Sequence, residues 1–359
     1  MSVAAASTVG PPPGMDVRLS SNESPFGPSP AALAAAREAA AAAHRYPDDQ
    51  SLELRGALAD RLGRPREEVA VGTGSAAVLM DVIANACHGA GAAEVLAFER
   101  SFVVYRLAAE NAGAHYVEVP TTNPPVPHAP EHRDVDALLA RVTDATRVIV
   151  VDNPGNPTGA HLDRDSLTRL VEDAPAHVTV VVDEAYHHFA RGQRGYAAVD
   201  ELDVTHPRLL TVTTFSKAYA LAGMRVGVLV GPAPLVAEVD GRRSRFNVTG
   251  PAQAAAIASL GDEEHLERTV AGTLEGRQRM VQGLTELGVR FADGLGNFVL
   301  LDVGGAVDDV VVAYAGHGVG VRPLAPYGMR SQLRVSVGTP PEVDAFLAAS
   351  REVLVDVPA

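Results

Sequence analysis

The sequence predicts an α/β fold, in which helices cover both faces of a mostly parallel central sheet and a smaller α+β domain is attached. From Val69 onward, short β-branched runs alternate with glycine- or proline-containing turns and helical stretches. The run 178–182 is apolar throughout, without an alternating polar face, which is typical of a strand covered by helices on both sides. At 359 residues the chain exceeds one domain of roughly 100 to 200 residues.

The N-terminal part predicts an arm and two helices. Residues 1–16 are mostly small and include three consecutive prolines, so we expect a disordered arm without a face to bury. Ser29 suits an N-cap and Pro30 the first helical position, which predicts a helix running to about His44. A second helix is predicted over about 51–62, where leucines recur on one face.

The remaining elements follow in two groups, with a proline-rich loop at 121–131 inside the first group. The strands predicted in the first group are Glu94–Phe98, His115–Val119, Arg147–Val151, Val178–Asp183, Leu209–Thr213 and Arg225–Val230. After about Asp240 the expected elements are a long helix around Glu264–Leu287, strands at Phe298–Asp302 and Leu333–Val337, and a helix over about Pro340–Val353. We therefore predict a large domain over 46–240 and a small domain formed by 17–45 and 241–359.

Charge and cysteine content restrict the class of partner. The formal net charge is −14, which argues against nucleic acid or an anionic membrane as the main partner. The single cysteine, Cys87, excludes an internal disulfide, and the sequence shows no secretory leader or membrane-spanning run. We expect a cytoplasmic protein that acts on small molecules.

The candidate chemistry centres on Lys217, which lies between two predicted strands. Thr214 and Ser216 precede it by three residues and one residue, and Arg225 follows eight residues later. A lysine that attacks an aldehyde must be neutral, and burial beside a basic group lowers its pKa. Arg225 would supply that basic group and bind a phosphate, to which the two hydroxyls add donors. An ordinary solvated lysine is the alternative for Lys217 taken alone.

Three motifs occur in a characteristic order: 156–159 (Asn-Pro-Thr-Gly), 183–186 (Asp-Glu-Ala-Tyr), and Ser216-Lys217 with Arg225. With them, from about Val17 to the final helix, the chain resembles the fold-type I pyridoxal-phosphate aminotransferases, within them the histidinol-phosphate and aromatic aminotransferase group. The resemblance implies the fold-type I architecture and pyridoxal 5'-phosphate held by Lys217 as a Schiff base. It also implies ping-pong transfer of an amino group between an amino acid and a 2-oxo acid.

The resemblance assigns three residues to the cofactor ring. Asp183 would pair with the pyridinium nitrogen, and a carboxylate at the end of an apolar strand does need a cationic partner. A helix N-cap is the alternative for this aspartate. Asn156 and Tyr186 would hydrogen-bond the phenolic oxygen. Gly155 stands where most relatives have a second asparagine, and we assign that position no role.

Further residues would hold the phosphate and the ring face. Gly74, Ser75 and Ala76 lie where a strand passes into a helix, and the free amides of a helix N-terminus attract phosphate. Phe102 would stack on the ring, or else is a core phenylalanine. Tyr46 matches a tyrosine that reaches the cofactor phosphate of a neighbouring subunit, which implies a homodimer.

On the substrate side, the resemblance assigns Arg334 to the α-carboxylate, a task for which a bidentate arginine is suited. A solvated strand arginine is the alternative. Asn297 would lie near the substrate, as would Asn22 and Phe26 on the N-terminal arm. Arg322 would bind a second acidic group.

Substrate and reaction are left with alternatives. Arg322 suits the phosphate of histidinol phosphate, but aromatic aminotransferases share an arginine there, and the sequence 322–328 looks more like theirs. An unusual amino acid of secondary metabolism is a further alternative. So are a decarboxylase or lyase of the same fold and a non-catalytic binding protein. His187 and His188 are given no role, and no metal site is predicted.

Overall fold

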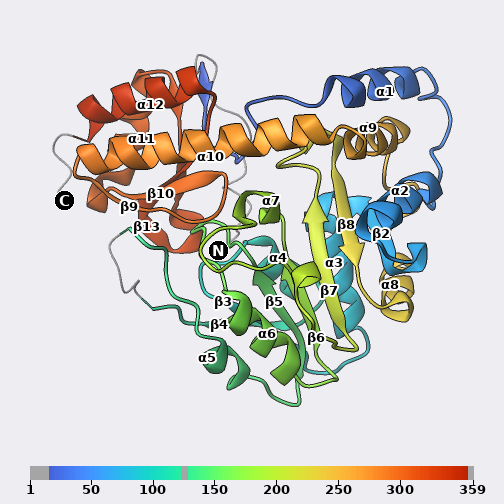
Figure 1. Cartoon of the computed structure of the whole chain (residues 1–359). Coiled ribbons are helices and arrows are strands. Elements are labelled where there is room, and N and C mark those ends of the chain that lie inside the picture. The colour runs from blue at the N-terminus through green and yellow to red at the C-terminus, as the bar shows by residue number, and fades with distance from the viewer. Residues whose placement is uncertain (1–15, 123–127, 355–359) are drawn as a thin grey trace.

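The computed structural model describes residues 16–122 and 128–354, so nearly all of the predicted arm and part of the proline-rich loop lie outside the described residues. Its main sheet has seven strands in the order β2-β8-β7-β6-β5-β3-β4 (Figure 1). Only β8 runs antiparallel to its neighbours among these pairings, which confirms the mostly parallel sheet. The strands are β2 Val69–Thr73, β3 Glu94–Phe98, β4 His115–Val119, β5 Thr146–Asp152, β6 Thr179–Asp183, β7 Leu209–Thr214 and β8 Val226–Val230.

Helices cover both faces of this sheet. Successive strand residues point to opposite faces, so neighbouring residues of one strand pack against different helices. Val148 and Val150 pack with α3 and α4, whereas Ile149 and Val151 pack with α5 and α6. Every residue of β6 is buried, as its continuous apolar sequence predicts. The helices are α3 Gly74–Cys87, α4 Val104–Asn111, α5 Val135–Leu139, α6 Arg164–Asp173, α7 His187–Ala190 and α8 Ala233–Asp240.

Three further helices pack at the β2 and β8 side of the sheet: α1 Pro30–Ala40, α2 Leu52–Leu62 and α9 Gly250–Leu260. Ser29 caps α1 as predicted, since its hydroxyl accepts from two backbone amides of the first turn. The helix ends at Ala40, earlier than the predicted His44. Gly63 ends α2 in a left-handed conformation.

A second sheet of four strands lies near the C-terminal end of the chain, in the order β12-β13-β10-β9. Helix α10 runs from this sheet across the molecule to α9 (Figure 1). The strands are β9 Arg290–Ala292, β10 Phe298–Asp302, β12 Arg322–Leu324 and β13 Met329–Ser336. The helices are α10 Glu263–Glu286, α11 Val307–Gly316 and α12 Pro340–Val353.

The N-terminal segment joins this second region through a short parallel pair, β1 Val17–Arg18 with β11 Val319–Gly320. Helices α1 and α9 share a core cluster with the large sheet, so the domain limits drawn from the sequence stay a prediction.

No helix within the described ranges is long and apolar enough to cross a membrane. The 3₁₀ turns are Arg66–Glu68, Val199–Glu201, Ala222–Met224, Gly304–Ala306 and Ala325–Tyr327.

Close backbone packing positions the start of α3. A Cβ added to Gly227 of β8 would lie 2.4 Å from the backbone carbon of Gly74 and 2.4 Å from the amide nitrogen of Ser75. Backbone atoms cannot move aside as the end of a flexible side chain can. The glycine at 227 thus sets how closely the first turn of α3 approaches the sheet.

We expect Gly227→Ala to lower the free energy of unfolding by about 1 to 3 kcal/mol, the usual cost of overpacking. Urea denaturation followed by circular dichroism measures the change. Gly91→Ala is the control, because a Cβ there meets no atom within 4 Å and its change should stay within about 0.5 kcal/mol. Equal stability of the two variants would contradict the proposed contact.

Candidate active site

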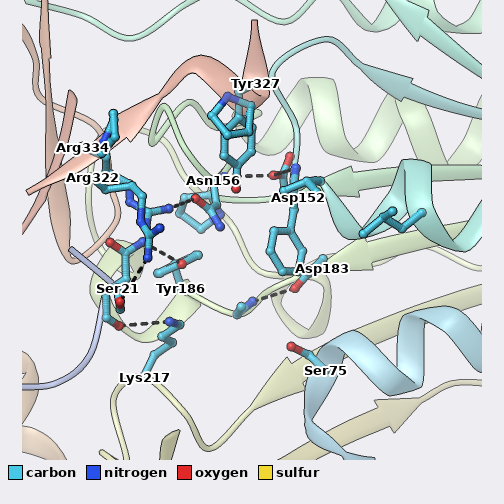
Figure 2. Close-up of a pocket in the computed structure, with 18 of the residues that line it drawn as sticks. Ser21, Ser75, Asp152, Asn156, Asp183, Tyr186, Lys217, Arg322, Tyr327 and Arg334 are labelled. Carbon is cyan, nitrogen blue, oxygen red and sulfur yellow. Dashed lines mark hydrogen bonds between the residues drawn. The ribbon is translucent and has the colours of Figure 1, made fainter. Parts of the chain in front are cut away.

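A cavity of about 1110 Å³ opens where β5 and β6 end, between the two sheets (Figure 2). Carboxyl ends of parallel strands meet at one edge of a sheet, so residues far apart in sequence gather there. The predicted site residues that line the cavity are Asn22, Ser75, Phe102, Asn156, Asp183, Tyr186, Lys217, Arg322 and Arg334.

Asp183, the last residue of β6, is only 3% exposed. Its carboxylate accepts hydrogen bonds from the Tyr105 hydroxyl at 2.9 Å and from the Ala185 amide at 3.1 Å. It forms no ion pair with any side chain in residues 16–122 or 128–354. Burial, and then the charge of Asp152, raises the pKa of Asp183 to about 7. A cationic ligand group beside it would satisfy this carboxylate.

Lys217 follows β7 and presents its amine to the cavity. Its Nζ donates to the backbone oxygen of Asn22 at 3.0 Å. Burial, and then the positive charge of Arg334, lowers the pKa of Lys217 to about 7. The predicted direction of the shift is correct, but Arg334 contributes more than Arg225, which we expected to be the basic neighbour.

A group of polar residues lies at the start of α3. The guanidinium of Arg225 is so close to Gly74 that a Cβ there would lie 2.3 Å from its Nη2. Arg225 also donates to the Ser216 hydroxyl at 3.4 Å, and Thr214 donates to the same hydroxyl at 2.9 Å. The helix begins Gly74-Ser75-Ala76, and its N-cap residue Thr73 makes no capping hydrogen bond through its side chain, so the first amides can bind an anion.

Two arginines face the cavity from the small sheet (Figure 2). Arg334 of β13 donates to the Asn156 side-chain oxygen and, at 3.2 Å, to the Ser20 carbonyl. Its buried Nε has no hydrogen-bond partner within the described ranges. Arg322 of β12 donates to the same Ser20 carbonyl at 3.0 Å. The pair therefore forms a basic wall suited to an acidic substrate group.

Asn22 connects the N-terminal segment to both sheets. Its side-chain amide donates to the Tyr186 hydroxyl at 3.0 Å, and its backbone amide donates to the Ser336 hydroxyl at 2.7 Å. Its carbonyl accepts from Asn297 at 3.1 Å as well as from Lys217. Asn297 is buried and does not line the cavity, and its hydrogen bond to Asn22 connects it to the site.

Two predicted residues lie away from the cavity. Phe26 packs on α10, where a Cβ added to Gly272 would be 2.7 Å from its ring. Tyr46 is 82% exposed and stacks on Phe246, with ring centroids 4.5 Å apart. The proposed contact of Tyr46 with a second subunit stays a prediction.

Sequence reasoning missed several lining residues, among them Ser21, Glu110, Asp152 and Tyr327. Asp152 had a usable signal, because it ends the apolar strand β5 just as Asp183 ends β6, and the two are register partners. Tyr327 stands in a motif that we quoted without assigning it a role.

His187 and His188 line a second cavity of about 460 Å³, between α2 and β7. Burial lowers the pKa of His187 to about 4 and holds the pKa of His188 well below its ordinary value. Within the described chain, no group of three or more metal-binding side chains is present.

Comparison with known proteins gives a consistent result. The sequence profile of aminotransferase class I and II matches residues 15–349. Histidinol-phosphate aminotransferase 2 of Methylococcus capsulatus is 40% identical over 94% of this chain and 90% of that protein. The aromatic amino acid aminotransferase of Thermobifida fusca is 41% identical over 95% and 91%. The crystal structure of histidinol-phosphate aminotransferase from Sinorhizobium meliloti in complex with pyridoxal-5'-phosphate superposes with a TM-score of 0.85 and 28% identity, covering 96% of this chain and 92% of that one.

The lowered pKa of Lys217 predicts a pH-dependent stability in the protein without cofactor. Between pH 7 and the ordinary value of 10.5, the unfolded chain binds more protons than the folded chain, so the free energy of unfolding rises with pH. Relative to Lys217→Met, we expect the wild type to gain on the order of 3 kcal/mol between pH 7 and pH 10. Urea denaturation of both proteins at several pH values measures this gain. A difference that does not vary with pH would show that the lysine is not buried as described.

Proposed function

The chain belongs to the class I and II aminotransferases and acts as a pyridoxal-phosphate-dependent aminotransferase, and we propose that Lys217 is the residue that holds its cofactor. One observation carries the assignment: an amine with a lowered pKa and a buried carboxylate, Asp183, open into the same cavity. A neutral amine can condense with an aldehyde.

The surrounding residues fit the other parts of pyridoxal phosphate. When bound, this cofactor supplies an aldehyde for the amine and a protonated ring that withdraws electrons from the substrate. Asp183 would keep the ring nitrogen protonated, and its lack of an ionic partner in the described chain supports this role. Asn156 and Tyr186 would hydrogen-bond the ring oxygen. The phosphate would bind Arg225 and the amides that begin α3, with Phe102 against the ring.

The reaction then depends on proton transfer by this chain's own groups. Lys217 Nζ, in its neutral form, would take the proton from the substrate Cα and deliver it to the cofactor carbon that receives the amino group. The Asn22 carbonyl holds that amine in place at 3.0 Å. Ser21 and Asn22 also form part of the cavity wall.

We propose an amino acid with an aromatic side chain as substrate. Phe102, Val103, Leu107, Pro326 and Tyr327 give the cavity an apolar wall suited to a planar group. The α-carboxylate would bind the basic wall of the cavity, at Arg334. Its unpartnered Nε supports this, because a carboxylate can accept two parallel hydrogen bonds from one guanidinium.

Histidinol phosphate is the second candidate substrate. The second basic residue of the cavity, Arg322, supports it, since phosphate carries more charge than carboxylate. Several relatives named histidinol-phosphate aminotransferase also support it. The 2-oxo acid that accepts the amino group would bind the same basic wall.

We further propose that the enzyme is a homodimer that works in the cytoplasm. Tyr46 supports the dimer: it is largely exposed, and it stacks on the partly exposed Phe246. Exposed aromatic pairs are typical of interaction surfaces. The single buried cysteine, Cys87, suits a reducing compartment.

We expect Lys217→Ala to abolish covalent attachment of the cofactor. After incubation with pyridoxal phosphate and reduction with borohydride, mass spectrometry should find the adduct on wild-type Lys217 and none on the variant. Lys217 is the only lysine in the sequence, so a reduced covalent adduct of equal yield on any other group of the variant would show that Lys217 is not the attachment site.

A panel of amino donors and 2-oxo acid acceptors tests the substrate assignment. It includes phenylalanine, tyrosine, histidine, histidinol phosphate, arginine and glutamate, with donor turnover followed by the absorbance of the pyridoxamine form. We expect kcat/KM for phenylalanine or tyrosine to exceed that for histidinol phosphate by at least about tenfold, or roughly 1.4 kcal/mol of binding to the transition state. Reaction with histidinol phosphate alone would overturn the aromatic assignment, and release of carbon dioxide in place of amino transfer would overturn the reaction.

A further inference from the structure

A buried arginine lies directly behind the cavity, in the loop before α5. The Arg133 side chain is 0% exposed. Its Nη1 donates to the Oδ1 of Asp152 at 2.8 Å and to the backbone oxygen of the same residue at 2.6 Å. Its Nη2 lies 3.7 Å from the Glu131 carboxylate. Among the described residues, Arg133 forms no hydrogen bond or ion pair with a predicted site residue, and its hydrogen bonds to Asp152 connect it to the site.

The second carboxylate oxygen of Asp152 holds two segments of the proposed cofactor site. Oδ2 accepts from the backbone amide of Phe102 at 3.1 Å and from the backbone amide of Asn156 at 2.9 Å. These two segments come from the loop before α4 and the loop after β5. One buried carboxylate therefore sets where the ring of Phe102 and the side chain of Asn156 stand relative to each other.

Gly155 provides the space that this arrangement needs. A Cβ at position 155 would lie 2.3 Å from the Nη2 of Arg133 and 2.8 Å from its Cζ. The guanidinium thus occupies the volume that a side chain at 155 would fill. The sequence motif alone assigned no role to Gly155, and the structure relates it to an arginine that is 22 residues away in the chain.

We propose that Arg133 is a positioning residue, which through the Asp152 carboxylate fixes the backbone of Phe102 and Asn156 at the cofactor site. This inference rests on the proposed function only in naming the cofactor as what the two segments contact. Without Arg133, Asp152 would be a buried charge without a cation, next to its register partner Asp183. The Asp152 carboxylate would then turn away or take up a proton, and both backbone amides would lose their acceptor.

Hydrogen exchange of the full-length protein, with mass spectrometry of its peptides, tests this directly. In Arg133→Met we expect amide exchange about tenfold faster in peptides that cover 101–105 and 155–158. The peptide covering 298–302, in β10, should be unchanged. Faster exchange in all three peptides would show a general loss of packing and would overturn the positioning role, as would unchanged exchange in the first two.

Arg100→Met is the matched control. Arg100 reaches the same Glu131 carboxylate, at 3.5 Å, but it is 39% exposed and does not contact Asp152 within the described residues. In Arg100→Met, amide exchange of the same peptides and kcat should both stay within about twofold of wild type.

For Arg133→Met we expect kcat to fall by about tenfold to a hundredfold, because the groups near the reacting atoms are displaced. Arg133→Lys keeps the charge, so it should recover part of the wild-type kcat and part of the slow amide exchange in the two peptides. If Arg133→Lys has the same kcat and exchange as Arg133→Met, the role of the charge is contradicted.

Gly155→Ala tests the same contact with Arg133 retained, so the wild-type background gives a result even if the Arg133 variants do not fold. In the wild-type background the added methyl should displace the guanidinium and speed exchange in the same two peptides. In an Arg133→Ala background it should have no further effect, because its steric partner is gone. Equal effects in both backgrounds would overturn the proposed contact. Faster exchange of these two peptides in the variant, together with a wild-type protein that transfers no amino group, would support the positioning role and refute the proposed function.

Discussion

The cavity depends on one constraint: two carboxylates, Asp152 and Asp183, end neighbouring strands inside the protein. Side by side in water they would simply be solvated, but here each is almost fully buried and must find a partner. The chain supplies that partner, Arg133, to Asp152 alone. Asp183 has hydrogen bonds but no cation among the described residues, and this asymmetry makes one carboxylate structural and leaves the other for a ligand.

Burial and neighbouring charges also determine the properties of the basic residues of the cavity. Burial and then the positive charge of Arg334 lower the pKa of Lys217, whereas burial and the positive charge of Arg322 lower the pKa of Arg334. An arginine remains charged through such a shift, whereas a lysine becomes neutral near pH 7. The residue type at each position therefore decides which group attracts an anion and which can act as a nucleophile or a base.

Sequence patterns predicted most of the architecture because their signals are local. Apolar runs bounded by turn residues located six of the seven strands of the large sheet to within one residue, whereas β2 was given no bounds; Ser29 marked the start of α1. The end of α1 was placed too late, since an alanine-rich run carries no stop signal before Tyr46 and Pro47. The short strands β9 and β12 were missed because they have too few residues to show a period.

The site was only partly predictable for a different reason. Motifs identified Lys217 and Asp183, but the partners that set their properties lie elsewhere in the chain. Ser336 is 314 residues from Asn22, and nothing in either local sequence indicates their contact. Arg133 follows the proline-rich loop without a motif, and only the fold shows that it lies against Gly155.

Asn22 has a consequence for how the arm and the reactive amine influence each other. The backbone carbonyl of Asn22 is the acceptor for the Lys217 amine. Any event that moves the amine away from this carbonyl therefore removes one of the hydrogen bonds that hold the segment around Asn22 in place. Thermodynamic linkage makes this influence reciprocal. Docking of the N-terminal segment and hydrogen bonding of the Lys217 amine each favour the other by the same free energy. The hydrogen bond from the Lys217 amine to the Asn22 carbonyl thus couples a segment that lines the cavity to the reactive amine.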